Sequence, residues 1–374
     1  MNLHIVTLTV YSLGLMALGL WIARRVRGAA DFFVAGRQLG PGLIFSTMLA
    51  ANIGAGSTVG ATGIAYSHGT SAWWWVGSAA FGSLVLAFVV GPSLRRVAAA
   101  NNLKTIGDYL EFRYSRAVRG TLSTLLWFGS IAILAGQLIA IGTILQAVAG
   151  LPFALGCGIG GAVIVVYFAA GGLLTSAWVN AVQLAVKLAG FAIATPLALA
   201  GAGGWAAIAS VQSPDPSYWS FWRSGPPGIM YLAVLGPAFF LSPGLLQKTF
   251  GARDDRAVRM GVGLNALGLF LYAAVPALLG VVARARFPDL VDEKLALPML
   301  LIQGLPPLVG AFGLAAVFSA EISAADAGLF MLTTSLSQDL YKRFVNPDAS
   351  DARVLLIARW TTFVCGLLAV ALAI

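Results

Sequence analysis

The sequence predicts an all-α polytopic membrane protein with about ten transmembrane helices. Hydrophobic residues make up 59% of the 374-residue chain and charged residues only 10%, and the mean hydropathy is +0.87. Apolar segments of membrane length recur along the whole chain, and two of them are interrupted near the middle by glycine or proline. Soluble domains carry far more charge, so we interpret residues 1–374 as a single transmembrane domain.

Ten candidate spans follow one another, joined by connections of varied length. They cover residues 4–23, 41–66, 72–92, 121–149, 152–171, 178–201, 229–247, 260–283, 309–337 and 354–374. Each is apolar over roughly 20 residues, the length that a helix needs to cross a bilayer. A short, half-buried helix over residues 295–304 is expected before the ninth span.

Basic residues fall mainly in alternate connections. If the N-terminus is outside, eighteen of the 23 lysines and arginines lie in cytoplasmic segments, four lie outside, and Lys187 lies within a span. This bias indicates a multi-pass protein of the plasma (inner) membrane. The net charge of +9 is then explained by topology and anionic lipid, and no nucleic-acid partner is expected. Gln247 and Lys248 end the seventh span and are assigned to an inner gate or to this topology.

The sequence offers no basis for catalysis. Only two histidines, His4 and His68, and two separate cysteines, Cys157 and Cys365, are present, which excludes a clustered histidine or thiolate metal site. Neither a nucleophile–base pair nor a phosphate-binding loop is found. We therefore expect neither an enzyme nor an organic cofactor.

Two spans are broken in comparable places. The second span is interrupted by the polar and glycine-rich run from Ala50 to Thr58, and the seventh contains Pro237 and Pro243. Proline removes a backbone donor, and freed backbone groups inside a bilayer survive only against protein, a cavity or a solute. Broken helices at corresponding positions of two halves indicate an inverted-repeat transporter. Two ordinary kinks are the alternative interpretation.

Six ordered elements resemble the sodium:solute symporter family. They are residues 31–40, 50–63, 105–114, 171–183, 245–248 and 323–344. The resemblance implies an added N-terminal helix and loop (1–40) followed by inverted five-helix repeats (41–202 and 229–374). The family core has ten helices after the added one, whereas nine are counted here, so we expect the second repeat to be incomplete and the chain to be a fragment.

The resemblance also implies sodium-coupled symport of a small organic solute by alternating access. Its sodium site would consist of the carbonyls of Ala50, Ile53 and Ala320 and the hydroxyl of Ser323. Hard oxygen ligands of this kind suit a small cation. Two positions depart from the family pattern, because Ala324 stands where a second hydroxyl is usual and Asn180 where Asp is frequent.

Three ionisable residues lie inside spans, where each is costly and hence a functional candidate. Helical phase places Asp326 on the face of Ser323 and turns Glu321 away from it. Lys187 ends a polar stripe that is expected to face the bundle, formed by Ser176, Asn180, Gln183 and Lys187. Asn180, Lys187 and Asp326 are candidates for coupling or gating. One hypothesis is that the Lys187 ammonium replaces the sodium ion and makes transport proton-linked or uncoupled; the alternative is a buried lysine–carboxylate pair that holds helices together.

The solute is expected beside the two breaks. The candidate solute-binding residues are Asn52, Ser57, Thr58, Gln137 and Trp75. Phe239 and Phe240 are gate candidates, with ordinary core packing as the alternative. No paired arginines are available for a dicarboxylate or phosphate, which favours a neutral or zwitterionic solute; sugar, amino acid, monocarboxylate and vitamin all remain open. A solute sensor that does not transport, or a non-transporting fragment, are rival functions. The oligomeric state is left open.

Overall fold

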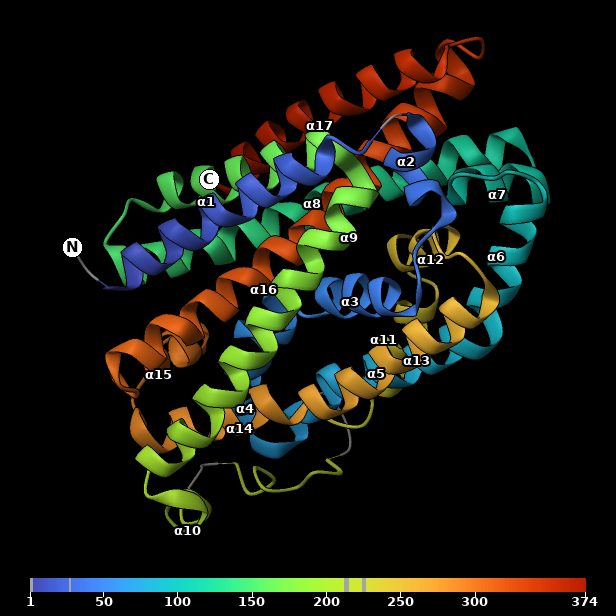
Figure 1. The fold of residues 1–374 in the computed structure, drawn as a ribbon. Helices are drawn as coiled ribbons and strands as arrows, with labels where there is room; N and C mark the ends of the chain where they lie inside the picture. Colours follow the sequence, from blue (N-terminus) through green and yellow to red (C-terminus); the bar gives the residue numbers. More distant parts are fainter. Residues whose placement is uncertain (1–2, 27, 212–214, 224–226) are drawn as a thin grey trace.

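The computed structural model describes residues 3–26, 28–211, 215–223 and 227–374, and it is helical throughout its membrane-length segments (Figure 1). Seven stretches of these residues are long and apolar enough to cross a membrane. The first half contains α1 (Leu3–Ala23), α2 (Ala29–Val34), α3 (Pro41–Asn52), α4 (Val59–His68), α5 (Trp73–Val85), α6 (Gly91–Ala100), α7 (Ile106–Arg113), α8 (Arg116–Ala149) and α9 (Phe153–Gly201). The second half contains α10 (Gly204–Ala209), α11 (Tyr231–Phe240), α12 (Pro243–Phe250), α13 (Asp255–Tyr272), α14 (Ala274–Arg286), α15 (Ala296–Gln303), α16 (Pro307–Thr334) and α17 (Asp351–Ala373).

The predicted all-helical membrane architecture is confirmed, and the short helix expected before the ninth span is α15. The 49 residues of α9 contain two predicted spans, and the helix is interrupted between them at Gly172 (φ 55°, ψ −141°). This backbone conformation is accessible to glycine and strained for other residues. The chain reverses there, and Figure 1 shows the two halves of α9 diverging from this point.

Helix α16 lies at the centre of the bundle and packs against α1, α3, α8, α9 and α17. The most apolar part of the segment from Pro307 to Val345 is 83% buried inside the protein, and small residues allow the neighbouring backbones to come close. A Cβ added to Gly190 of α9, for example, would lie 2.5 Å from the Cβ of Ala316. This central position makes every polar side chain of α16 a neighbour of some other helix.

The two ends of the bundle carry different connections. Helices α2, α6 and α7 gather at one end, whereas α10 and α15 lie at the opposite end (Figure 1). At the α7 end, a π-helical segment, η6 (Ser335–Val345), extends α16 toward α17. The candidate site lies between these ends, where α3 and α11 stop.

Candidate functional site

The first broken helix opens over residues 53–58. Helix α3 ends at Asn52, and the backbone of Ile53 and Gly54 is extended (φ, ψ of −97°, 94° and −139°, −161°). A short 3-10 turn, η2 (Ala55–Ser57), leads into α4. The predicted break is therefore confirmed, although it is narrower than the run from Ala50 to Thr58, because the first three residues of that run remain helical.

Side chains satisfy the backbone donors that this break releases. The N–H of Gly54 donates to Oγ of Ser57 at 2.9 Å, and the N–H of Ala55 donates to Oε1 of Gln137 at 2.9 Å. In an uninterrupted helix these donors would bond the carbonyls of residues 50 and 51. Gln137 of α8 thus holds the break in place. The unpaired donors of a broken helix are met here by protein, as the bilayer requires.

The released carbonyls of the break receive the ammonium of Lys187. Its Nζ donates to the carbonyl oxygens of Ala50 (2.8 Å) and Ile53 (3.3 Å) and to Oγ of Ser323 (2.6 Å). The hydroxyl of Ser323 in turn donates to the carbonyl of Ala50 (2.8 Å) or of Ala320 (3.0 Å). Three acceptors match the three N–H donors of a lysine. Three of the four residues expected to ligate a cation, Ala50, Ile53 and Ser323, therefore meet around the side chain of Lys187, and the carbonyl of the fourth, Ala320, bonds only the Ser323 hydroxyl.

A buried carboxylate lies on the other side of the break. Oε1 of Glu321 accepts a hydrogen bond from Oγ1 of Thr58 at 2.8 Å, and both residues are almost fully buried. Helical phase turned Glu321 away from Ser323, and this is observed. The broken segment nevertheless contacts both faces of α16, because Ser323 on one face bonds Ala50 and Glu321 on the other face bonds Thr58. The pairing of Glu321 with Thr58 was not anticipated from the sequence.

A second buried polar cluster lies next to the first. Asp326 accepts hydrogen bonds from Ser176 and, at 3.1 Å, from Nδ2 of Asn180. Asn180 also donates to Oγ1 of Thr47 at 3.2 Å. The residues of the predicted polar stripe, Ser176, Asn180, Gln183 and Lys187, are all buried, so its orientation toward the bundle is confirmed.

The position of Lys248 corrects the sequence interpretation. The topology assignment places it in a cytoplasmic segment, whereas its side chain is fully buried and Nζ donates to the carbonyl of Thr47 at 3.0 Å; its assignment to an inner gate stays a prediction. The reason is the second break, between Leu241 and Ser242, after which α12 packs against α3 and α16. Lys248 thereby enters the polar core.

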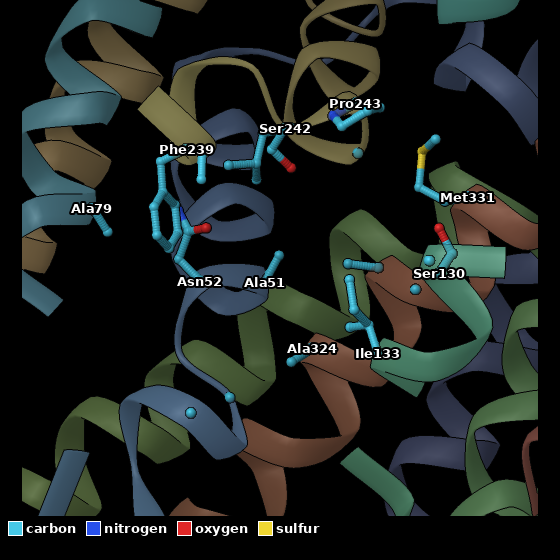
Figure 2. Close-up of a pocket in the computed structure, with 18 of the residues that line it drawn as sticks. Ala51, Asn52, Ala79, Ser130, Ile133, Phe239, Ser242, Pro243, Ala324 and Met331 are labelled. Atoms are coloured by element: carbon cyan, nitrogen blue, oxygen red, sulfur yellow. The ribbon is translucent and has the colours of Figure 1, made fainter. Parts of the chain in front are cut away.

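A cavity of ≈ 460 Å³ lies between the two breaks. Figure 2 shows Asn52 and Phe239 on one side of it and Ile133, Ser130 and Met331 on the other. Among the predicted solute and gate residues, its lining includes Asn52, Ser57, Trp75, Gln137 and Phe239. Thr58 and Phe240 are not part of this lining; the Thr58 hydroxyl instead meets Glu321.

The lining of this cavity is neutral. Among the described residues that form it, none carries a charged side chain, and the polar groups are amides, hydroxyls and the indole of Trp75. Ala324 contributes a methyl group, and a Cβ added to Gly54 would lie 2.3 Å from its Cβ. Helix α16 therefore touches the break directly, and it leaves room at this point only for glycine.

An ion-pair network closes the α7 end of the bundle. Arg119 of α8 pairs with Asp108 (2.7 Å), Glu111 (3.1 Å) and Asp339 (2.9 Å), and Arg343 also pairs with Glu111. Partial burial alone would raise the pKa of Glu111. Hydrogen bonds from Arg343 and Arg119 outweigh this effect and hold that pKa below its ordinary value. The network joins α7, α8 and η6 at this end of the bundle.

Comparison with known proteins identifies relatives of this chain. The model of the sodium:solute symporter family matches residues 32–374. The chain is 25% identical to the high-affinity proline transporter PutP of Bacillus subtilis, covering 96% of this chain and 78% of the relative. It is 26% identical to the sodium/pantothenate symporter of Escherichia coli, covering 90% of this chain and 72% of the relative. The solved structure of a Na⁺-coupled sialic acid symporter, in a substrate-bound outward-open state, has the same fold, with a TM-score of 0.86 at 17% identity over 100% of this chain and 82% of that one.

Proposed function

Because this chain belongs to the sodium:solute symporter family, we propose that it is a secondary active transporter that carries a small organic solute in sodium-coupled symport by alternating access. A family of transporters also places the protein outside the enzymes. The single observation that carries the proposal is the cavity at the first break. It combines unwound backbone, a converging set of oxygen atoms and space for a solute at one level of the bundle.

The solute that suits this cavity is uncharged or zwitterionic. The described lining offers neutral hydrogen-bonding groups from Asn52, Gln137 and Ser242 and an aromatic surface from Trp75. A net charge would enter this low-dielectric space without a counter-ion, which is unfavourable. Two of the relatives are named for proline, which is zwitterionic, and pantothenate, which is anionic, so the neutral lining favours the first of these in a screen.

We place the α7 end of the bundle on the cytoplasmic side of the plasma membrane and the N-terminus on the outer side. The α7 end carries most of the exposed basic residues, among them Arg96 of α6 and Arg113 of α7, which is the distribution expected of cytoplasmic loops. Cysteine labelling of Leu3→Cys in intact cells, against Phe112→Cys in α7, tests this orientation. Labelling of the α7 position alone by an impermeant reagent contradicts it.

A second candidate function is a proton-linked or uncoupled carrier. The position of Lys187 favours it, because its Nζ occupies the point at which the family resemblance placed the sodium ion. A cation that is tethered to the chain fills this site without any gradient. Sodium dependence of uptake therefore separates the two candidates.

Uptake into proteoliposomes tests both functions. Radiolabelled proline, pantothenate, a hexose and a monocarboxylate are supplied under an inward sodium gradient, an inward proton gradient, or neither. Accumulation that requires sodium supports symport, and accumulation that is indifferent to sodium supports the second candidate. Ligand-specific thermal stabilisation of the purified protein without any uptake would contradict both and indicate a sensor.

A further inference from the structure

Lys187 occupies a position that a free cation would otherwise take. Its ammonium is fully buried and is held by two main-chain carbonyls of the break and by Ser323. We propose that Lys187 and a sodium ion are mutually exclusive at these oxygens, and that sodium enters only when the ammonium moves to Glu321. This inference rests on the proposed function, since it specifies how the cation site of the transporter is filled.

Shared ligands make the exclusion necessary. All three acceptors lie within 3.3 Å of Nζ, so a second cation bound to the same oxygens would be in direct contact with the first. Like charges at such a distance repel strongly in a low-dielectric interior. The donor set suits sodium, but the site as arranged does not fit sodium and the ammonium together.

The charges of the buried core reinforce this conclusion. Within the described part of the bundle, the two clusters around the break contain Lys187 and Lys248 as cations and Glu321 and Asp326 as carboxylates, all fully buried. These charges cancel in number. An added sodium ion would leave one buried positive charge without a counter-charge, which membrane interiors disfavour. The Lys187 ammonium stays in the core when it moves, so this net charge does not change; direct pairing of the ammonium with a carboxylate is what lowers the cost of admitting sodium.

Glu321 is the carboxylate prepared to receive it. One of its oxygens accepts a hydrogen bond from Thr58, whereas Oε2 is buried and has no hydrogen-bond partner among the described residues. Buried polar atoms are rarely left unpaired. Lys187 contacts the start of the break and Glu321 its end, so the two side chains face the same unwound segment. Movement of the ammonium toward Oε2 would satisfy that oxygen and release the carbonyls of Ala50 and Ile53.

Asp326 is engaged differently. Its Oδ2 accepts from Ser176 and Asn180 in the second cluster, and its Oδ1, like Oε2 of Glu321, has no hydrogen-bond partner among the described residues, but no hydrogen bond connects Asp326 to the break. Lys248 in that cluster donates to the carbonyl of Thr47 and not to the break. The exchange is therefore assigned to Lys187 and Glu321 alone.

Sodium binding without solute tests the inference. The purified protein in lipid nanodiscs is titrated with sodium chloride against choline chloride of equal ionic strength, and binding is followed by ²²Na⁺ retention and by the sodium-dependent rise in melting temperature. Removing the ammonium in Lys187→Met should increase sodium affinity at least ten-fold. Lys187→Arg, which keeps a positive charge, should show no increase.

The variant Glu321→Gln shows whether Glu321 receives the Lys187 ammonium or only attracts sodium by its negative charge. If Glu321 receives the ammonium, this change should weaken sodium binding about ten-fold in the presence of Lys187 and much less in the Lys187→Met background. The charge-neutral double variant Lys187→Met/Glu321→Gln also serves if the single lysine variant does not fold, because it should then bind sodium more tightly than Glu321→Gln. Equal affinity of wild type and Lys187→Met, or equal weakening by Glu321→Gln in both backgrounds, overturns the proposal. Neither result depends on transport, so absence of uptake for every solute would count against the proposed function and leave this inference standing.

Discussion

The ammonium of Lys187 lies 2.6 Å from Oγ of Ser323 and thereby joins the second half of α9 to α16 at the level where α3 ends. The same ammonium bonds the carbonyl of Ala50, so one charged group connects three helices. In a transporter whose helices rearrange between two states, a shared cation of this kind stabilises whichever state brings the three together. By linkage, any ligand that favours that state also strengthens the contact of Lys187 with Ser323 and Ala50.

Loss of the Ser323 hydroxyl should destabilise the protein. In Ser323→Ala the buried ammonium of Lys187 keeps only two of its three acceptors, and hydrogen bonds to charged groups contribute about 1.5–3 kcal/mol. We expect a lower melting temperature in detergent or nanodiscs. Ser337→Ala is the matched control, because the buried hydroxyl of Ser337 bonds only the carbonyl of Thr333 in its own helical segment. Equal losses in both variants would contradict a special role for Ser323.

Gln137 should keep the backbone of the break, residues 53–58, rigid. Its Oε1 accepts from the N–H of Ala55, and Gln137→Leu would leave that buried donor unpaired at a cost of about 1–3 kcal/mol. Hydrogen exchange of the peptide covering residues 53–58 should accelerate relative to wild type, while exchange in α17, away from the break, stays unchanged. Unaltered exchange of the break in the leucine variant would show that Gln137 does not hold it.

Hydropathy and backbone chemistry were sufficient to predict the architecture. The apolar runs, the glycines near Gly54 and the prolines Pro237 and Pro243 locate the spans and both breaks, because an interrupted apolar segment has few alternatives in a bilayer. The stripe that ends at Lys187 follows from helical period alone, and so does its inward orientation. These features depend on local sequence, which explains why they could be anticipated.

The partners of the buried charges could not be derived in the same way. Helical phase gives the direction of Glu321 relative to Ser323, but it does not show that the chain at Thr58 passes that other face of α16. Lys248 stands at the end of an apolar run, so sequence position alone places it at the membrane boundary. Only the inward packing of α12 after its break reveals that it is buried.

The pairing of Glu111 should make stability pH-dependent. Its pKa is lower in the folded protein than its ordinary value, because Arg343 and Arg119 donate to the carboxylate. The stabilisation is therefore fully present above the unfolded pKa of about 4.3 and is lost as the pH falls through the lower folded value. Wild type should exceed Glu111→Gln in melting temperature at pH 7, and the difference should shrink at pH 4 and below. A difference that is constant across this range would contradict the argument.

Gly54 should tolerate no side chain, since the break and α16 are in contact there. A Cβ at this position would lie 2.3 Å from the Cβ of Ala324 and 2.9 Å from Oε1 of Gln137. Gly54→Ala must therefore push α16 or α8 away from the break, and overpacking of this kind costs about 1–3 kcal/mol. Gly56→Ala is the control, because its added Cβ would meet only the Trp75 ring at 3.7 Å. We expect the first variant to lower the melting temperature and abolish sodium-dependent stabilisation, and the second to retain both; the opposite order would show that the break does not pack against α16 in the membrane.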